Sequence, residues 1–232
     1  MRSILIEWPS KFDEIILNDL LSFKQRIQKK LFNEIIYVNS AYNSILVCYK
    51  NYNHDFNIRV KVLKTIYNLK RLKYPKQQRL WKIPVCYDLK FGIDLKALSI
   101  SKNIDANEII DLHSNAIYTV YFTGFLPGFL YLGGLPETLN NPRKTTPRLK
   151  VPKGAVAIGG NQTGIYPEEC PGGWHIIGNS PVNLFDVNKK TPSFIRSGDK
   201  IKFVNVPLEK HKSILVLVEN NIYQLENEVL DD

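Results

Sequence analysis

The chain has 232 residues, with 44% hydrophobic and 23% charged side chains and a formal net charge of +9, which is typical of a globular protein of one large or two ordinary domains. Glu7 comes before any apolar signal-peptide core could form, and no apolar run approaches the ~20 residues needed to cross a bilayer, so we expect a soluble, cytoplasmic protein with no membrane partner. The three cysteines are odd in number, far apart and without a CxxC spacing, which predicts neither a disulfide framework nor a metal site.

The first 87 residues alternate between strand and helix patterns. A short strand at 4–8 precedes a helix that Ser10 would cap and whose apolar residues recur at helical spacing up to Leu31. Two strand-like runs at 34–39 and 44–50 follow as a hairpin. The remaining elements are a second helix from Ile58 to Leu72, ended by Pro75, and a last strand at 79–87. The order β-α-β-β-α-β predicts a ferredoxin-like domain at residues 1–87, with a four-stranded sheet and both helices on one face.

A block of cations without acids runs through the end of this domain, between residues 56 and 87. Such a block binds nucleic acid or an acidic partner surface in some proteins. No zinc-finger spacing or aromatic RNA-binding strand accompanies it, so we interpret it as a solvated helix face and expect no nucleic-acid partner. His54, in a polar turn, is expected on the surface.

Residues 88–232 follow a different pattern and are predicted to form a second, barrel-like domain. Two short helices are expected near 94–99 and 105–114. Beyond Ile117 short apolar runs separated by glycine and proline predict a closed or nearly closed β-barrel. These runs are 118–123, 155–159, 174–178, 183–186, 200–206 and 213–219. The acidic tail at 224–232 is expected to be frayed or loosely docked.

Glycine and proline concentrate between Thr123 and Pro181, where the sequence specifies backbone geometry and predicts a loop-lined pocket. Glycine loops bring backbone N–H groups close to anionic oxygens. Arg143 and Arg148 follow prolines, and arginines on such stiff turns suit a bidentate clamp for carboxylate or phosphate. The remaining candidates are neutral hydrogen-bonding residues, apolar walls and loop residues: Gln162, Thr163, Tyr166, Phe125, Phe129, Tyr131, Trp174, Pro127, Gly128, Gly172 and Gly173.

The sequence lacks the common phosphate-binding, dinucleotide-binding, metalloprotease and nucleophile-elbow motifs. His113 and His175 are candidate general bases, although a lone histidine is more often structural. Cys170 is interpreted as a structural thiol rather than a nucleophile. The residues by themselves therefore predict a two-domain protein with a loop-lined site and leave its reaction open.

Several long segments resemble one known family. They are YFTGFLPGFLYLGGL at 121–135, QTGIYP at 162–167 and PGGWHIIG at 171–178, with further matches at 85–95 and 112–114. These segments are similar to the family of the 5-oxoprolinase B subunit, whose members are also labelled KipI-type kinase inhibitors or allophanate hydrolase subunit 1. The resemblance implies a ferredoxin-like domain followed by a cyclophilin-like β-barrel. It does not imply prolyl isomerase activity, because a fold does not carry function with it.

The resemblance also implies an activity that this chain performs only with partners. The A and C subunits would complete an enzyme that hydrolyses 5-oxo-L-proline to L-glutamate, with ATP as co-substrate, accompanied by Mg, and with no cofactor bound to this chain. Within it, Arg143, Arg148 and His113 are expected to be catalytic, and Gln162, Thr163, Gly172 and Gly173 to position the substrate. Asn179 stands where family members often carry arginine.

Two other functions fit the same resemblance. One is an inhibitor that docks on a sensor histidine kinase, and the other is a carboxyltransferase-like component of urea or allophanate metabolism.

Overall fold

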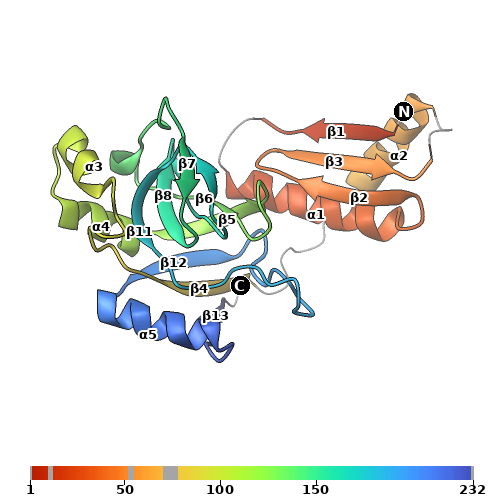
Figure 1. Ribbon diagram of the computed structural model, residues 1–232. Helices are drawn as coiled ribbons and strands as arrows, with labels where there is room; N and C mark the ends of the chain where they lie inside the picture. The colour runs from red at the N-terminus through yellow and green to blue at the C-terminus, as the bar shows by residue number, and fades with distance from the viewer. Residues whose placement is uncertain (1, 10–12, 52–54, 70–77, 231–232) are drawn as a thin grey trace. The chain divides into compact units, whose positions relative to one another are not determined.

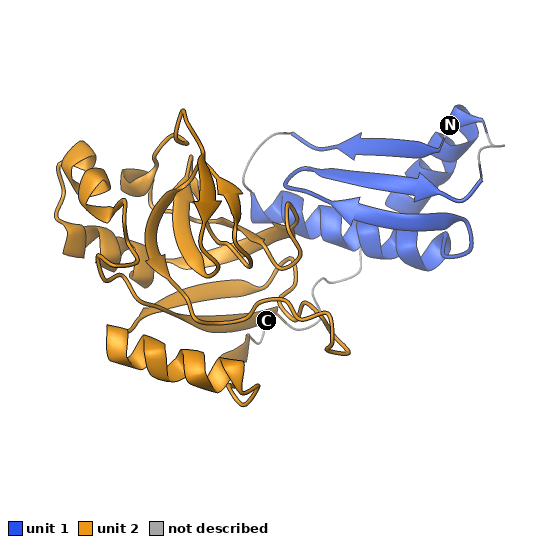
Figure 2. Ribbon diagram, in the orientation of Figure 1, with its two compact units in different colours: residues 1–77 blue, residues 78–232 orange. Residues whose placement is uncertain are grey.

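The computed structural model describes residues 2–9, 13–51, 55–69 and 78–230. It divides into two compact units, residues 1–77 and 78–232 (Figure 2). The division falls before the strand expected at 79–87 and not after it. Ser10, His54, Leu72 and Pro75, which the sequence-based predictions used, lie outside the described residues.

The first unit contains a three-stranded antiparallel sheet in the order β1-β3-β2 (Figure 1). The strands of the predicted hairpin are confirmed as neighbours, with Val38 opposite Val47. The elements are β1 (Ser3–Glu7), α1 (Glu14–Lys30), β2 (Ile35–Ser40), β3 (Ser44–Tyr49) and α2 (Phe56–Tyr67).

Asp13 caps the N-terminus of helix α1, and its carboxylate accepts a hydrogen bond from the Ile15 N–H at 2.7 Å. An aspartate at this position satisfies one of the N–H groups that the first turn leaves without a helical partner. The helix buries Leu17, Leu20 and Ile27 against the sheet, as its apolar spacing predicts.

Two arginines of this unit are buried and hydrogen-bonded to backbone. Arg26 on α1 donates from Nη1 to the carbonyls of Ile66, Tyr67 and Leu69 at the C-terminal end of α2, where a cation is favourable. Arg59 on α2 lies over the Tyr49 ring at 4.1 Å. The prediction that the basic block forms a solvated helix face is therefore wrong for Arg59, although the neighbouring lysines of α2 are exposed.

The fourth strand of the predicted ferredoxin-like sheet belongs to the second unit. Strand β4 (Gln78–Val85) pairs in parallel with β12 (Lys200–Asn205) and antiparallel with β13 (Asn227–Leu230). The described part of the first unit therefore has the order β-α-β-β-α. The apolar pattern of β4 fits either sheet, and only the pairing decides between them.

The second unit is built on an eight-stranded mixed sheet in the order β11-β8-β9-β6-β5-β12-β4-β13. A backbone bridge between Cys86, after β4, and Asn179 on the first strand of that order curls the sheet toward closure. A cyclophilin-like barrel stays a prediction. The further strands are β5 (Ile117–Thr123), β6 (Leu130–Gly133), β7 (Arg148–Val151), β8 (Ala155–Gly159), β9 (Gln162–Ile165), β10 (Cys170–Gly172) and β11 (His175–Asn179).

Helices α3 (Leu95–Lys102) and α4 (Ala106–Asn115) confirm the two helices expected after residue 88. Residues 213–219 were expected as a strand, but they belong to helix α5 (Leu208–Glu219), which buries His211 and Ile214. Residues 183–186 form no strand, and the tail expected to fray contributes β13 to the sheet. A β-branched run such as ILVLV in α5 has no unique local preference, so packing determines its structure.

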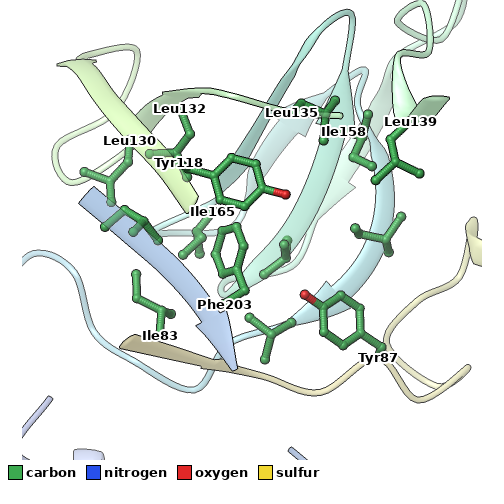
Figure 3. Packing of buried hydrophobic residues seen from close by; sticks show 14 of the residues in the cluster. Ile83, Tyr87, Tyr118, Leu130, Leu132, Leu135, Leu139, Ile158, Ile165 and Phe203 are labelled. Carbon is green, nitrogen blue, oxygen red and sulfur yellow. The ribbon is translucent and has the colours of Figure 1, made fainter. Parts of the chain in front are cut away.

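The core of the second unit fills the concave side of the sheet with aliphatic and aromatic side chains (Figure 3). Tyr118 and Phe203 are its largest fully buried side chains, and their ring centroids are 5.2 Å apart. In the part of the chain that the structure describes, no helix is both long and apolar enough to cross a membrane.

Replacement of Phe203 by alanine is expected to destabilise the second unit by about 3–5 kcal/mol, because it removes a buried aromatic ring and leaves a cavity. The neighbouring Val204 is 39% exposed, so Val204→Ala is a matched control on the same strand and should cost under about 1 kcal/mol. Urea unfolding followed by tryptophan fluorescence measures both. Equal losses for the two variants would contradict this description of the core.

Candidate functional site

A cleft of about 300 Å³ in the second unit collects most of the residues predicted to line a pocket. Its lining comprises Phe125, Phe129, Tyr131, Arg143, Lys144, Pro147, Tyr166, Pro171, Gly172, Gly173 and Trp174. The predicted set thus converges from loops that are up to about fifty positions apart in the chain, which is the arrangement expected of a small-molecule site.

The floor of the cleft is an aromatic cluster centred on Phe129. Its ring makes edge-to-face contacts with Tyr166 at 5.4 Å and Trp174 at 5.6 Å, and a tilted contact with Tyr131 at 4.8 Å. Such geometries are favourable for aromatic quadrupoles and fix the rings relative to one another. The floor is therefore rigid and apolar.

Glycines on strands β8 and β9 allow Trp174 to lie against the sheet. A Cβ at Gly164 would meet Cζ3 of Trp174 at 3.2 Å, and one at Gly159 would clash with the indole ring. A side chain at either position would push the tryptophan outward and fill the cleft. These glycines are consequently part of the site although they do not line it.

The loop between β5 and β6 forms one rim. Phe125 adopts a positive φ of 67°, is 62% exposed and meets the Phe129 ring edge-on at 5.7 Å. Gly128 also has a positive φ, and a Cβ there would lie 2.7 Å from Cβ of Phe185. Gly128 therefore shapes the turn. Neither it nor the exposed Pro127 lines the cleft.

Another part of the rim carries cations. The guanidinium of Arg143 lies 5.6 Å from the centroid of the Trp174 ring, a cation–π contact at an exposed position. The backbone N–H of Lys144 donates to the Gly173 carbonyl at 2.8 Å, which ties the arginine loop to the two glycines. An anion bound over the aromatic floor would meet Arg143 first.

Asp94, just before α3, holds the other two cations of this rim. Its Oδ1 accepts from Arg148 at 2.6 Å and pairs with Lys144 at 3.0 Å, and its Oδ2 accepts from the Ile176 N–H at 2.8 Å. Burial by itself would raise the pKa of Asp94, but hydrogen bonds from Arg148, Ile176 and Lys144 lower it below its ordinary value. Arg148 is thus anchored beside the cleft and does not line it.

His113 and Thr163 lie in the core of the second unit, away from the cleft. Thr163 Oγ1 donates to the Ala157 carbonyl at 3.0 Å, so it must accept the proton of His113 Nε2 at 2.8 Å. His113 Nδ1 then accepts from the Tyr87 hydroxyl at 2.7 Å. Burial lowers the pKa of His113 to about 3, which keeps the imidazole neutral.

This geometry does not support a general-base role for His113, because the ring is fully buried and both nitrogens are occupied by neighbouring side chains. Gln162 is buried on β9 and is also absent from the cleft lining. The other candidate base, His175, contacts the Pro142 carbonyl through Nε2 at 3.0 Å.

The two phenols at the floor act as neutral groups. Burial raises the pKa of Tyr166 to about 12 and also raises that of Tyr131. Both hydroxyls therefore stay protonated at neutral pH and can donate hydrogen bonds. Among the described residues, no group of three or more histidine, cysteine or acidic side chains could hold a metal ion.

Sequence reasoning missed Asp94 and Lys144 as members of the site. Asp94 lies about fifty residues before the cations that it binds, so only the fold brings them together. The sequence placed Asp94 at the start of the helix expected near 94–99, and that position gave no sign of a role in the site.

Comparisons with known proteins agree with this architecture. Residues 1–195 match the family model described as carboxyltransferase domain, subdomain C and D. The chain is 41% identical over 186 residues to the 5-oxoprolinase B subunit of Haemophilus influenzae, covering 80% of this chain and 85% of that protein. It is 44% identical over 133 residues to the 5-oxoprolinase B subunit of Bacillus subtilis, covering 57% of this chain and 55% of that relative. The latter match thus spans little more than half of the relative's length.

Solved structures show the same fold. The protein TTHA0988 matches 88% of this chain and 40% of its own at 29% identity, with a TM-score of 0.77. The conserved uncharacterized protein PH0987 of Pyrococcus horikoshii is 35% identical, with a TM-score of 0.55 and 91% and 97% of the two chains covered. Urea amidolyase of K. lactis, at 17% identity and a TM-score of 0.83, covers 99% of this chain and 16% of its own and shows the fold alone.

The fold and the family model define a protein of the carboxyltransferase subdomain C and D class. Within that class the chain belongs to the family of the 5-oxoprolinase B subunit, as its glycine- and proline-rich segments predict.

The buried imidazole of His113 predicts a pH dependence of stability. Its folded pKa of about 3 lies below the unfolded value of 6.5, so the unfolded chain takes up a proton first as the pH falls. The stability that neutral His113 provides is fully present above about pH 6.5 and is lost toward pH 3, at up to about 1.4 kcal/mol per pH unit.

Nitrogen-15 NMR of the ring checks this directly. We expect an Nε2–H tautomer whose ring shifts stay constant between pH 7.5 and about 5. An imidazole that titrates within that interval would contradict the buried network.

Proposed function

We propose that this protein is the B subunit of an ATP-dependent 5-oxoprolinase, which acts with the A and C subunits to hydrolyse 5-oxo-L-proline to L-glutamate. The proposal is supported by the 41% identity to the Haemophilus influenzae protein over most of both chains. The single structural observation that carries it is the small cleft with an aromatic floor and Arg143 at its rim. We expect no turnover from this chain alone.

The cleft suits a small ring that bears a carboxylate. The flat lactam ring would lie on the apolar floor beside Trp174, and its carboxylate would reach the Arg143 guanidinium. At about 300 Å³ the cleft is at the small end of ligand pockets, so a whole nucleotide would not fit beside the lactam. The nucleoside part of ATP is therefore assigned to a surface that a partner protein completes.

The reaction requires activation of a poor electrophile. A lactam carbonyl is stabilised by amide resonance. Transfer of the γ-phosphoryl group of ATP to its oxygen, with release of ADP, would open the carbon to attack by water, and hydrolytic loss of inorganic phosphate with cleavage of the ring C–N bond would then give glutamate. The charge that develops on those oxygens calls for fixed donors, and Arg143 with the Gly172–Gly173 backbone would supply them in this chain. Mg would arrive on the phosphates of ATP and shield their charge.

The kinase-inhibitor and urea-linked functions are weaker proposals. The likeness to urea amidolyase at 17% identity concerns the fold alone. The described residues offer no observation that favours a sensor kinase as partner.

Reconstitution tests the proposal. Mixed with its cognate A and C subunits, the protein should produce glutamate from 5-oxoproline only when ATP is present, and omission of this chain should abolish turnover. A folded three-component mixture without turnover would contradict the proposal, and kinase autophosphorylation would be assayed next.

Arg143→Ala is expected to reduce kcat/KM for 5-oxoproline about 100-fold, because it removes the cation that faces the cleft. Lys150→Ala is the matched control, since Lys150 lies on the adjoining strand β7, is 79% exposed and pairs with Glu169. Glutamate release and size-exclusion chromatography of the complex give activity and assembly. Equal activity of the two variants would contradict a role for Arg143 in substrate binding.

Arg148 requires a separate test, because its contact with Asp94 offers a structural role beside the predicted clamp. If Arg148 clamps the substrate, Arg148→Ala should reduce turnover at least about 100-fold while thermal stability and assembly persist. A loss of turnover that merely follows a loss of stability would assign Arg148 to the support of Asp94. Asp94→Asn, which weakens that support and leaves Arg148 present, distinguishes the two roles.

A further inference from the structure

The first unit carries a second concave surface, larger than the candidate site. A groove of about 450 Å³ runs between strand β1 and helix α2. Its lining consists of Ile4, Leu5, Ile6, Glu7, Trp8, Pro9, Phe23, Phe56, Val60, Leu63, Lys64 and Tyr67. We call this surface the β1–α2 groove. It shares no residue with the cleft, and the inference below does not depend on the proposed function.

The groove exists because two helices lie over only three strands. A helix is about 10 Å wide and strands are spaced about 4.8 Å apart, so two helices side by side cover about four strands. Helix α1 packs on β2 and β3, and α2 packs beside α1. Helix α2 therefore extends beyond β1, over the position where a fourth strand would lie.

The outer edge of β1 carries backbone groups suited to pair with such a strand. The Tyr49 N–H donates to the Arg2 carbonyl, and the Trp8 N–H donates to the Asn43 carbonyl. In an antiparallel pair this pattern alternates, so the even-numbered residues of β1 bond to β3. The N–H and C=O groups of Ser3, Leu5 and Glu7 point the other way. No described strand pairs with them, and Figure 1 shows β1 at the edge of the sheet.

The side chains around this edge are apolar and accessible. Leu5 is 56% exposed and Phe56 is 47% exposed. Ile4 is buried on the helix-covered face, which leaves a hydrophobic surface beneath α2 for the alternate side chains of an added strand. An exposed edge with these properties is a template for strand addition.

The charges around the groove select the partner. Helix α2 carries the exposed Lys61 and Lys64 and no acidic residue, and Lys64 lines the groove. Arg59, by contrast, is buried against the Tyr49 ring. The only acid in the lining is Glu7. Neither Lys61 nor Lys64 forms an ion pair within the part of the chain that the structure describes. The rim therefore favours a segment with acidic flanks.

We propose that the β1–α2 groove binds an extended, acid-flanked apolar segment of a partner protein, which adds to the sheet beside β1 as a fourth strand. A second copy of this chain is a poor occupant. Pairing β1 with β1 about a two-fold axis would place both α2 helices over the same junction, where each already extends past its own edge. A single strand without a helix of its own meets no such obstacle.

The test uses the full chain and a fluorescent peptide in which valine alternates with threonine between pairs of glutamates. Fluorescence anisotropy should show binding, and the amide resonances of Ser3, Leu5 and Glu7 should shift in the presence of peptide. Leu5→Pro removes one outward N–H without breaking a β1–β3 hydrogen bond, which an edge strand tolerates. It should weaken binding at least about 10-fold, whereas Leu5→Val, which keeps the N–H, should bind as the unaltered protein does.

Two further measurements keep the proposal falsifiable if Leu5→Pro fails to fold. Val60→Glu, which places a like charge in the groove, should also weaken binding about 10-fold, and so should N-methylation of the valine amides of the peptide. Equal binding by Leu5→Pro and Leu5→Val, or equal binding of a peptide flanked by lysines, would overturn the proposal. A concentration-dependent dimer that Leu5→Pro dissociates in sedimentation would also overturn it and assign the groove to a second copy.

Discussion

The mouth of the candidate site depends on the hydrogen bonds and ion pairs of the Asp94 carboxylate. This carboxylate joins the start of α3, the backbone of β11 at Ile176, Lys144 in the loop before β7 and Arg148 at the start of β7, all around one buried side chain. A buried carboxylate is tolerated only when its oxygens are paired, so these contacts fix one another. The cations of the rim therefore have different roles. Lys144 and Arg148 are held by Asp94, while Arg143 faces the cleft over the Trp174 ring.

The rest of the cleft depends on glycines that leave room for aromatic side chains. Trp174 lies against the sheet because Gly159 and Gly164 leave space for its ring, and Phe129 then joins it to the two tyrosines of the floor. Phenols that stay protonated and an apolar floor add no charge to the cleft, so the cations of its rim, Arg143 among them, determine its electrostatics. The proposed substrate, 5-oxoproline, suits this combination, because it has one flat ring and one carboxylate.

The first unit presents a different kind of surface, the β1–α2 groove. There the limiting constraint is the number of strands, since β4 pairs with β12 and β13 and the described sheet beneath α1 and α2 keeps three. Because the described sheet has three strands, the β1–α2 groove lies open and no described strand pairs with the outward backbone groups of β1. The cleft suits a small anion and the groove an extended chain, which is consistent with a protein that works within a larger assembly.

The sequence by itself determined the elements with strong local signals and the family. Helical spacing located α1 and α2, and two short helices were expected where α3 and α4 lie. The turn between β2 and β3 gave the hairpin, and the glycine- and proline-rich segments located most of the cleft. Tertiary structure decided what local patterns leave open. The strand at 78–85 has no intrinsic preference between two sheets, and the run at 213–219 became helical because one face of it packs. His113 and Asp94 likewise acquired their roles from neighbours far along the chain, since burial and hydrogen-bond partners are properties of the folded molecule.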